Sequence, residues 1–189
     1  MVYNVPNILT LLRIVLIPVM VLLFLLPFRW GNEAAAAVFV LAALTDWFDG
    51  YLARRLGQVS LLGAFLDPVA DKLMVTTALV LLVQAEPSWW MALASAVIIG
   101  REITISAVRE WMAELGARAQ VAVSEIGKVK TAAQMTAIAL LMYRQDVLGL
   151  PVYIIGHVLL YLAVVLTLWS MTLYLRAAWP RLTGVVQDD

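Results

Sequence analysis

The stretch that decides the fold runs from Asp46 to Asp71 and reads DWFDGYLARRLGQVSLLGAFLDPVAD. It contains four aspartates and two adjacent arginines. The chain around it is very different, because 63% of its 189 residues are hydrophobic and only 14% are charged. Soluble domains average about 45–50% apolar and about 25% charged residues. This composition predicts an integral membrane protein in which a group of carboxylates lies at or near membrane depth.

Apolar runs on both sides of this stretch predict an all-α membrane protein with six transmembrane helices in a single domain, residues 1–189. A helix needs about 20 apolar residues to cross a bilayer. We expect the spans at 6–27, 33–55, 62–85, 88–114, 125–143 and 152–178. No Lys or Arg precedes the first run, so we expect a retained span and not a cleaved signal peptide. Arg13, near the start of this span, is expected to extend its long side chain to the interface.

Lysine and arginine gather on one side of the expected six-helix arrangement. That side would hold Arg54, Arg55, Arg109, Arg118, Lys128, Lys130, Arg176 and Arg181. The loops on the other side hold only Arg29 and Arg144. Because cytoplasmic loops carry an excess of Lys and Arg, we expect both termini and the polar stretch to face the cytoplasm. Net charge is zero and no basic tail exists, so nucleic acid is not expected as a partner.

Helix geometry predicts that the four aspartates converge. At 3.6 residues per turn, one face of the first helix carries Asp46, Asp49, Gly50 and Ala53. On the next helix, Asp67 and Asp71 are about one turn apart. A tight turn around Gly57 would make the two helices antiparallel neighbours. The carboxylates of both helices would then point into one site.

Converging carboxylates inside a membrane need a compensating positive charge. Each charged residue at the bilayer centre costs about 2.5–3.5 kcal/mol on insertion scales. Arg54, Arg55 and Lys72 would compensate in part, which would make the group a structural polar cluster at helix ends. Bound divalent cations compensate better, and a carboxylate site in a chain without cysteine suits Mg²⁺, with Mn²⁺ close behind. Two ions about 3.5–4 Å apart would form the clamp used in phosphoryl displacement.

Taken together, the stretch resembles the signature of a known family. The pattern Asp46-x2-Asp49-Gly50-x2-Ala53-Arg54-x8-Gly63-x3-Asp67-x3-Asp71 is similar at every position to that of the CDP-alcohol phosphotransferases. The resemblance implies that the first three aspartates bind two metal ions. It also implies that the fourth, Asp71, helps to bind metal and acts as the general base.

The same resemblance implies a binding site for the CDP group. Its residues would be Gly50, Ala53, Arg54 and Gly63, joined by Asn7 and Thr10 near the start of the chain. The small residues also fit close packing between helices. Capping of the first helix accounts equally well for Asn7 and Thr10.

Three further stretches resemble the bacterial members of this family that use sn-glycerol 3-phosphate as acceptor. They are NVPNILTLLRIVLIP from Asn4, GREITISAVREWMAELG from Gly100 and VAVSEIGKVKTAAQM from Val121. This resemblance implies a reaction of CDP-diacylglycerol with sn-glycerol 3-phosphate, giving phosphatidylglycerol phosphate and CMP. It also implies a homodimer in the bacterial cytoplasmic (inner) membrane.

An acceptor that carries its own phosphate needs cations. Candidates on the expected cytoplasmic side are Arg109, Arg118, Lys128 and Lys130, although the positive-inside bias alone would also place cations there. Arg101 lies deeper, and we expect it either to bind the acceptor phosphate or to pair with a buried acid. His157, the only histidine, is expected to be a packing or interface residue.

Two other functions remain open at this point. Serine or inositol could replace glycerol 3-phosphate in the same chemistry, but neither acceptor carries a phosphate. A divalent-cation transporter could use the acids as a pathway, but it would not need the Gly/Ala spacing or Arg54.

Overall fold

The computed structural model of the chain describes residues 5–56, 61–114 and 125–182, and near some helix ends, including 49–56 and 125–128, it describes the backbone only. These residues form α1 (Val5–Leu25), α2 (Gly31–Leu56), α3 (Leu61–Ala85), α4 (Trp89–Glu114), α5 (Glu125–Tyr143) and α6 (Val152–Leu182). The expectation of an all-α protein with six helices is confirmed. The largest difference in a helix end is four residues, between the expected end at 178 and the observed end at Leu182.

Three of the helices are long and apolar enough to cross a membrane. The spans are Asn7–Leu25, Trp89–Glu114 and Val152–Arg176, within the part of the chain that the structure describes. The other helices include α2 and α3, which carry the signature aspartates, and α5, which begins with charged residues. Charged side chains lower the mean hydropathy of a segment. The chain is therefore a multi-pass membrane protein in which α2, α3 and α5 together carry more charged residues than the other three helices.

Local sequence signals set the helix ends. Ser88 precedes α4, and its Oγ accepts a hydrogen bond from the backbone N–H of Met91 at 3.1 Å, which is the geometry of an N-cap. Between α1 and α2 the chain reverses so tightly that a Cβ on Gly31 would lie 2.5 Å from the carbonyl oxygen of Leu23. A glycine is therefore required at the start of α2, where it keeps α1 and α2 close together.

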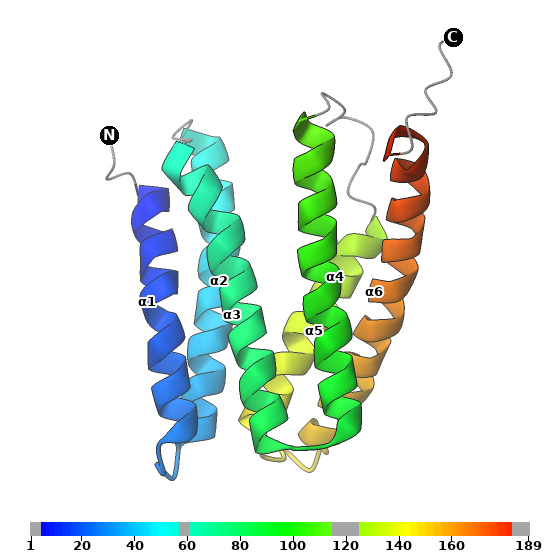
Figure 1. Ribbon diagram of the computed structural model, residues 1–189. Helices are drawn as coiled ribbons and strands as arrows, with labels where there is room; N and C mark the ends of the chain where they lie inside the picture. Colours follow the sequence, from blue (N-terminus) through cyan, green and yellow to red (C-terminus); the bar gives the residue numbers. More distant parts are fainter. Residues whose placement is uncertain (1–4, 57–60, 115–124, 183–189) are drawn as a thin grey trace.

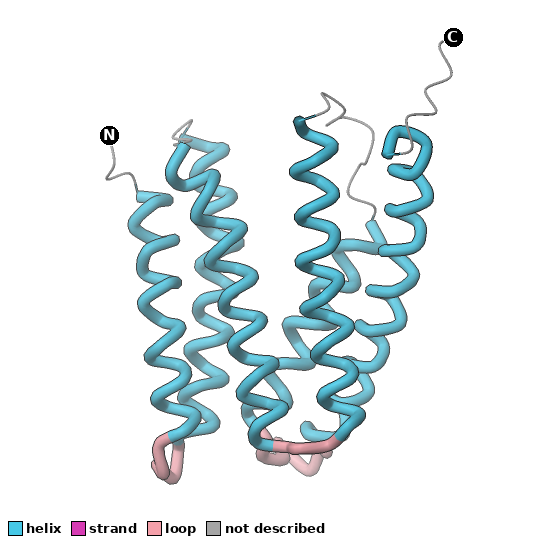
Figure 2. The backbone as a smooth tube through the Cα atoms, in the orientation of Figure 1, coloured by secondary structure: helices cyan, strands magenta, loops and turns pink. Residues whose placement is uncertain are grey.

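The helices run up and down, and the start of α1 and the end of α6 lie at the same end of the bundle (Figure 1). The ends of α2 and α4 and the start of α3 lie there too, whereas short loops join helices at the opposite end (Figure 2). We call these the signature end and the loop end. The largest interfaces join α1 to α2 and α5 to α6. Among the described residues α4 packs against α3 and α6 but not directly against α5, and polar side chains occupy the space between α4 and α5.

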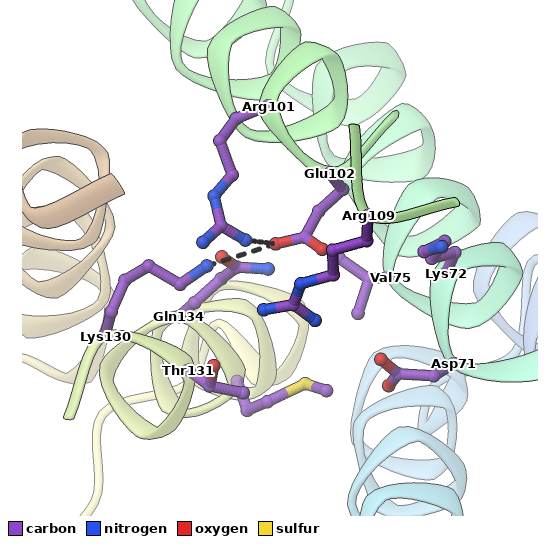
Figure 3. A pocket seen from close by; sticks show the side chains of 10 residues that line it. Asp71, Lys72, Val75, Arg101, Glu102, Arg109, Lys130, Thr131 and Gln134 are labelled. Atoms are coloured by element: carbon purple, nitrogen blue, oxygen red, sulfur yellow. Dashed lines mark hydrogen bonds and ion pairs between the residues drawn. The ribbon is translucent and has the colours of Figure 1, made fainter. Parts of the chain in front are cut away.

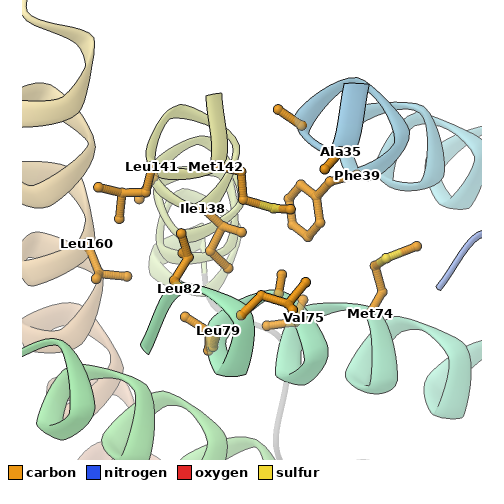
Figure 4. Packing of buried hydrophobic residues seen from close by; sticks show 14 of the residues in the cluster. Ala35, Phe39, Met74, Val75, Leu79, Leu82, Ile138, Leu141, Met142 and Leu160 are labelled. Atoms are coloured by element: carbon orange, nitrogen blue, oxygen red, sulfur yellow. The ribbon is translucent and has the colours of Figure 1, made fainter. Parts of the chain in front are cut away.

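The apolar core lies toward the loop end and takes buried side chains from all six helices, and Figure 4 labels those of α2, α3, α5 and α6. On α3 the buried positions Val75, Ala78, Leu79 and Leu82 follow helical spacing and form one apolar stripe. Phe39 of α2 and Ile138 of α5 are buried against this stripe. The loop end is therefore tightly packed, while the signature end leaves room for polar groups.

Candidate active site

A polar stripe on α1 faces the signature helices. Asn7, Thr10 and Arg13 follow one another every three residues and are buried, with at most 1% of each residue exposed. Thr10 donates a hydrogen bond from its Oγ1 to the carboxylate of Asp67. The Nη1 of Arg13 forms an ion pair with Oδ1 of Asp46 at 2.6 Å. The first helix thus contacts a signature carboxylate on both α2 and α3.

The expectation that Arg13 extends to the interface is wrong. Its side chain is 2% exposed and is fixed by Asp46. A buried charge is tolerated where it has an ionic and hydrogen-bonded partner, and an intramembrane carboxylate provides one. Arg13 therefore supplies part of the positive charge that the sequence assigned to Arg54, Arg55 and Lys72.

Asp71 lies one turn beyond Asp67 on α3 and points into a cavity between α3, α4 and α5 (Figure 3). Its carboxylate makes no hydrogen bond or ion pair with any described residue. Its charge interacts with the carboxylates of Asp46 and Glu102 and with the cations of Arg13 and Lys72. A carboxylate that is electrostatically crowded but not hydrogen-bonded keeps its oxygens available for a proton or a cation.

The cavity that Asp71 faces has a volume of about 210 Å³ and brings together residues far apart in the sequence. Its lining includes three of the five expected cations, Arg101, Arg109 and Lys130, together with Glu102 and Gln134. A second cavity of about 490 Å³ adjoins it between α3 and α4 and shares Asp71 and Arg101. The two cavities form a polar space large enough for small molecules, because one water occupies only about 30 Å³.

Glu102 organises the cations of this space. Its Oε1 lies 2.7 Å from Nη1 of Arg101 and 3.1 Å from Nζ of Lys130. The second of these ion pairs links α4 to α5, two helices that do not pack directly. The expected pairing of Arg101 with an acid is found, and its side chain lines the cavity. Its binding of the acceptor phosphate stays a prediction.

Two further contacts position the α4 side of the site. Lys72, next to Asp71 on α3, donates a hydrogen bond to Oγ of Ser106 on α4. The guanidinium of Arg109 lies 5.7 Å from the centre of the Tyr174 ring on α6, within cation–π range. The helix face that carries Glu102, Ser106 and Arg109 is thus held from both sides.

Not every predicted site residue can be placed. Gly63 is buried on α3. Only the backbone is described for Asp49, Gly50, Ala53 and Arg54 on α2 and for Lys128 on α5, and Arg118 lies outside the described residues. Their roles, and those of the residues described above, stay predictions.

The described aspartates offer only part of a metal site. Among the described side chains, which do not include that of Asp49, no three His, Cys, Asp or Glu lie close enough together to hold an ion. Asp46 and Asp67 each use one oxygen for α1, and each has a second carboxylate oxygen. An oxygen-only donor set fits a hard divalent cation such as Mg²⁺.

Sequence reasoning missed Arg13, Glu102 and Gln134. The sequence did contain a sign of their location, because a lone ionisable or amide side chain within an apolar helix usually faces the bundle interior. The three-residue spacing of Asn7, Thr10 and Arg13 also placed them on one face of α1. Neither signal identifies the partner, since Glu102 and Lys130 are 28 positions apart in the sequence.

Comparisons with known proteins identify the family of the chain. Residues 3–169 match the family described as CDP-alcohol phosphatidyltransferase. The chain is 56% identical over 176 residues to the CDP-diacylglycerol–glycerol-3-phosphate 3-phosphatidyltransferase of Escherichia coli (strain K12), covering 93% of this chain and 95% of that protein. It is 55% identical, with the same coverage, to the protein of that name from Salmonella choleraesuis (strain SC-B67). The chain therefore belongs to the CDP-alcohol phosphatidyltransferase family.

Proposed function

We propose that the protein transfers the phosphatidyl group of CDP-diacylglycerol to sn-glycerol 3-phosphate, giving phosphatidylglycerol phosphate and CMP. The observation that carries this proposal is the cavity in which Asp71, a carboxylate without a hydrogen-bond partner among the described residues, faces Arg101, Arg109 and Lys130. The names of the bacterial relatives at 55–56% identity support the choice of both substrates.

The acceptor phosphate would bind the cations of α4 and α5. Charge-assisted hydrogen bonds from Lys and Arg are the strong ones for phosphate, and Arg can donate two at once. Lys130 and Arg101 are already held by Glu102, so little side-chain freedom remains to be lost on binding. Arg109 is more exposed and would close over the phosphate. Arg118 and Lys128 are proposed to add positive charge at the cytoplasmic edge of the acceptor site.

The nucleotide and its diphosphate would bind beside the signature aspartates. Gly50, Ala53, Arg54 and Gly63 are proposed to bind the CDP group, with Asn7 and Thr10 reaching it from α1. Asp46, Asp49, Asp67 and Asp71 would hold Mg²⁺ or Mn²⁺, in two ions. The ions, when bound, neutralise the charge of the diphosphate and of the leaving CMP.

Transfer is proposed to occur in one displacement. An acceptor hydroxyl oxygen attacks the phosphorus that carries diacylglycerol, and a new P–O bond forms. The bond between that phosphorus and the oxygen of CMP breaks, and CMP leaves with the electron pair. The hydroxyl proton passes to a carboxylate oxygen of Asp71, which acts as the general base.

This chemistry fits the cytoplasmic face of a bacterial inner membrane. Arg109 belongs to the signature-end half of the bundle, and the loop end has Arg29 and Arg144 in its connections. The Lys and Arg distribution supports a cytoplasmic signature end, where a soluble acceptor meets a membrane lipid. We also propose that the protein acts as a homodimer, as its family resemblance implies.

One assay separates the candidate functions. Purified protein in detergent is supplied with CDP-diacylglycerol and Mg²⁺, and CMP release is measured with glycerol 3-phosphate, serine or inositol. We expect release only with glycerol 3-phosphate. Release with serine or inositol would identify another acceptor. A transporter would give none with any acceptor, and would move Mn²⁺ across the membrane of a proteoliposome without CDP-diacylglycerol.

A further inference from the structure

Two residues that line the cavity beside Asp71 each have a buried side-chain atom that no described residue satisfies. These atoms are Nε of Arg101, which can only donate a hydrogen bond, and Oε1 of Gln134, which can only accept one. Other unsatisfied atoms, such as Ser95 Oγ and Thr167 Oγ1, belong to residues that do not line this cavity. A buried polar group without a partner is costly, and native proteins rarely leave one unless a ligand or water completes it.

Gln134 is well placed to receive a ligand. It is 4% exposed and lies one helical turn beyond Lys130 on α5. Its side-chain amide lies beside the Arg101–Glu102–Lys130 cluster, with the oxygen next to Lys130 and the nitrogen toward Arg109 (Figure 3). A molecule bound to these cations would therefore lie within reach of the Gln134 amide.

The two unsatisfied atoms together describe the missing partner. It must offer an anionic or neutral oxygen acceptor to Arg101 and an O–H or N–H donor to Gln134. A phosphate alone supplies only the first. A phosphorylated polyol supplies both, because the hydroxyl that does not react is free to donate a hydrogen bond.

We propose that Gln134 is a specificity-determining residue, whose Oε1 accepts a hydrogen bond from the non-reacting secondary hydroxyl of the acceptor. This inference rests on the proposed function. It adds that the protein recognises the secondary hydroxyl of the acceptor as well as its phosphate. The primary hydroxyl, being less hindered, is left to react near Asp71. Recognition of the neighbouring hydroxyl fixes the orientation of the acceptor, so that the reacting oxygen approaches the phosphorus in one geometry.

The test compares two acceptors that differ only in this hydroxyl. They are glycerol 3-phosphate and 3-hydroxypropyl phosphate, which keeps the phosphate and the primary hydroxyl. An acceptor without the secondary hydroxyl leaves Oε1 buried and unsatisfied, so the wild-type protein should prefer glycerol 3-phosphate in kcat/KM by roughly fivefold to a hundredfold. In Gln134→Met, a substitution of similar length and shape, this preference should fall to near one. In Gln134→Glu, which keeps an oxygen acceptor there, a preference should remain.

The ratio of the two kcat/KM values is measured on one protein sample, so it does not depend on how much of a variant is correctly folded. Gln84→Met, the same substitution at an exposed position of α3, should keep the wild-type ratio. Equal use of both acceptors by the wild-type protein, or an unchanged preference in Gln134→Met, would overturn the assignment. Failure of the wild-type protein to use glycerol 3-phosphate at all would instead overturn the proposed function.

Discussion

At the signature end of the bundle charged side chains surround a cavity, whereas at the loop end they satisfy one another. Near the loop end, Nε2 of His157 lies 3.0 Å from Oε2 of Glu86, and the Tyr153 hydroxyl donates a hydrogen bond to the same oxygen. Arg144 donates to the carbonyl oxygen of Ala85 at 3.2 Å and lies over the Tyr153 ring. In this polar group, which we call the loop-end cluster, the Glu86 carboxylate is held by two partners, while Nε of Arg144 is buried without a hydrogen-bond partner among the described residues.

The cavity side of the signature end is not closed. Asp71 has no hydrogen bond to a described residue, and Gln134 and Arg101 each keep an unsatisfied buried atom. Both ends contain acids, bases and aromatic rings, so composition alone does not distinguish them. The difference is that Asp71, Arg101 and Gln134 line one shared cavity, whereas the Glu86 carboxylate is occupied by His157 and Tyr153. This indicates ligand binding at one end and structural support at the other.

The largest effect is expected from the metal ligands. Asp67→Asn should reduce CMP release below detection even at saturating Mg²⁺, because an amide binds a hard cation much more weakly than a carboxylate does. Asp46→Asn should behave in the same way, and chelation of divalent ions should abolish the wild-type activity until Mg²⁺ is restored. Asp146→Asn, in the exposed α5–α6 connection, is the matched control and should be unaffected.

These results can separate a ligand role from a structural one. Asp67 also accepts the hydrogen bond of Thr10, so Thr10→Val tests whether that contact alone explains the loss. Wild-type turnover in Asp67→Asn would remove this residue from the metal site.

A smaller but still large effect is expected at Asp71. Asp71→Asn keeps the shape of the side chain but cannot take up a proton at the required position. Loss of a general base typically lowers the rate by about 10²–10⁴. We expect kcat to fall by this factor while the affinity for CDP-diacylglycerol, measured by direct binding, changes little. If affinity falls together with kcat, Asp71 is chiefly a metal ligand and the base must be sought elsewhere.

Next come the cations of the cavity. Lys130→Ala and Arg109→Ala should each raise KM for glycerol 3-phosphate by roughly tenfold to a hundredfold, because a hydrogen bond to a charged group contributes about 1.5–3 kcal/mol. KM for CDP-diacylglycerol should remain nearly unchanged. Arg144→Ala removes a cation from the loop-end cluster and is the control. If both cavity variants fold normally and keep the wild-type KM for glycerol 3-phosphate, these cations do not bind the acceptor and only set the orientation of the protein in the membrane.

The sequence was sufficient to predict the helices, but it was not sufficient to predict every residue of the site. Helix ends were predictable because Pro27, Pro87 and Pro151 interrupt long apolar runs, and an apolar run of this length has few alternatives to a membrane helix. The signature aspartates were predictable because helical spacing places each pair on one face. Arg13 was misjudged, since its sequence position allows both an interfacial and a buried side chain.

Partners between helices could not be predicted. The ion pair of Lys130 with Glu102 depends on how α5 is inclined relative to α4, and no local pattern fixes that geometry. The same holds for Gln134, whose importance follows from an absent partner and not from its residue type. The three-dimensional packing therefore shows what the sequence alone does not, namely which polar groups already have a hydrogen-bond partner.

The smallest effect is expected at the loop-end cluster, and it should fall on stability alone. His157→Phe keeps a ring of similar size but removes the contact with Glu86, which retains its hydrogen bond from Tyr153. A net hydrogen bond contributes about 1 kcal/mol, which corresponds to a fall in Tm of about 2–4 °C for a chain of this length. Thermal unfolding in detergent would measure this fall, and His157→Gln, which can still donate to Glu86, should recover part of it. Because the cluster is remote from Asp71, kcat and both KM values should equal those of the wild-type protein. A loss of turnover in His157→Phe without a loss of stability would show that the loop end takes part in the reaction, and the contrast between the two ends would fail.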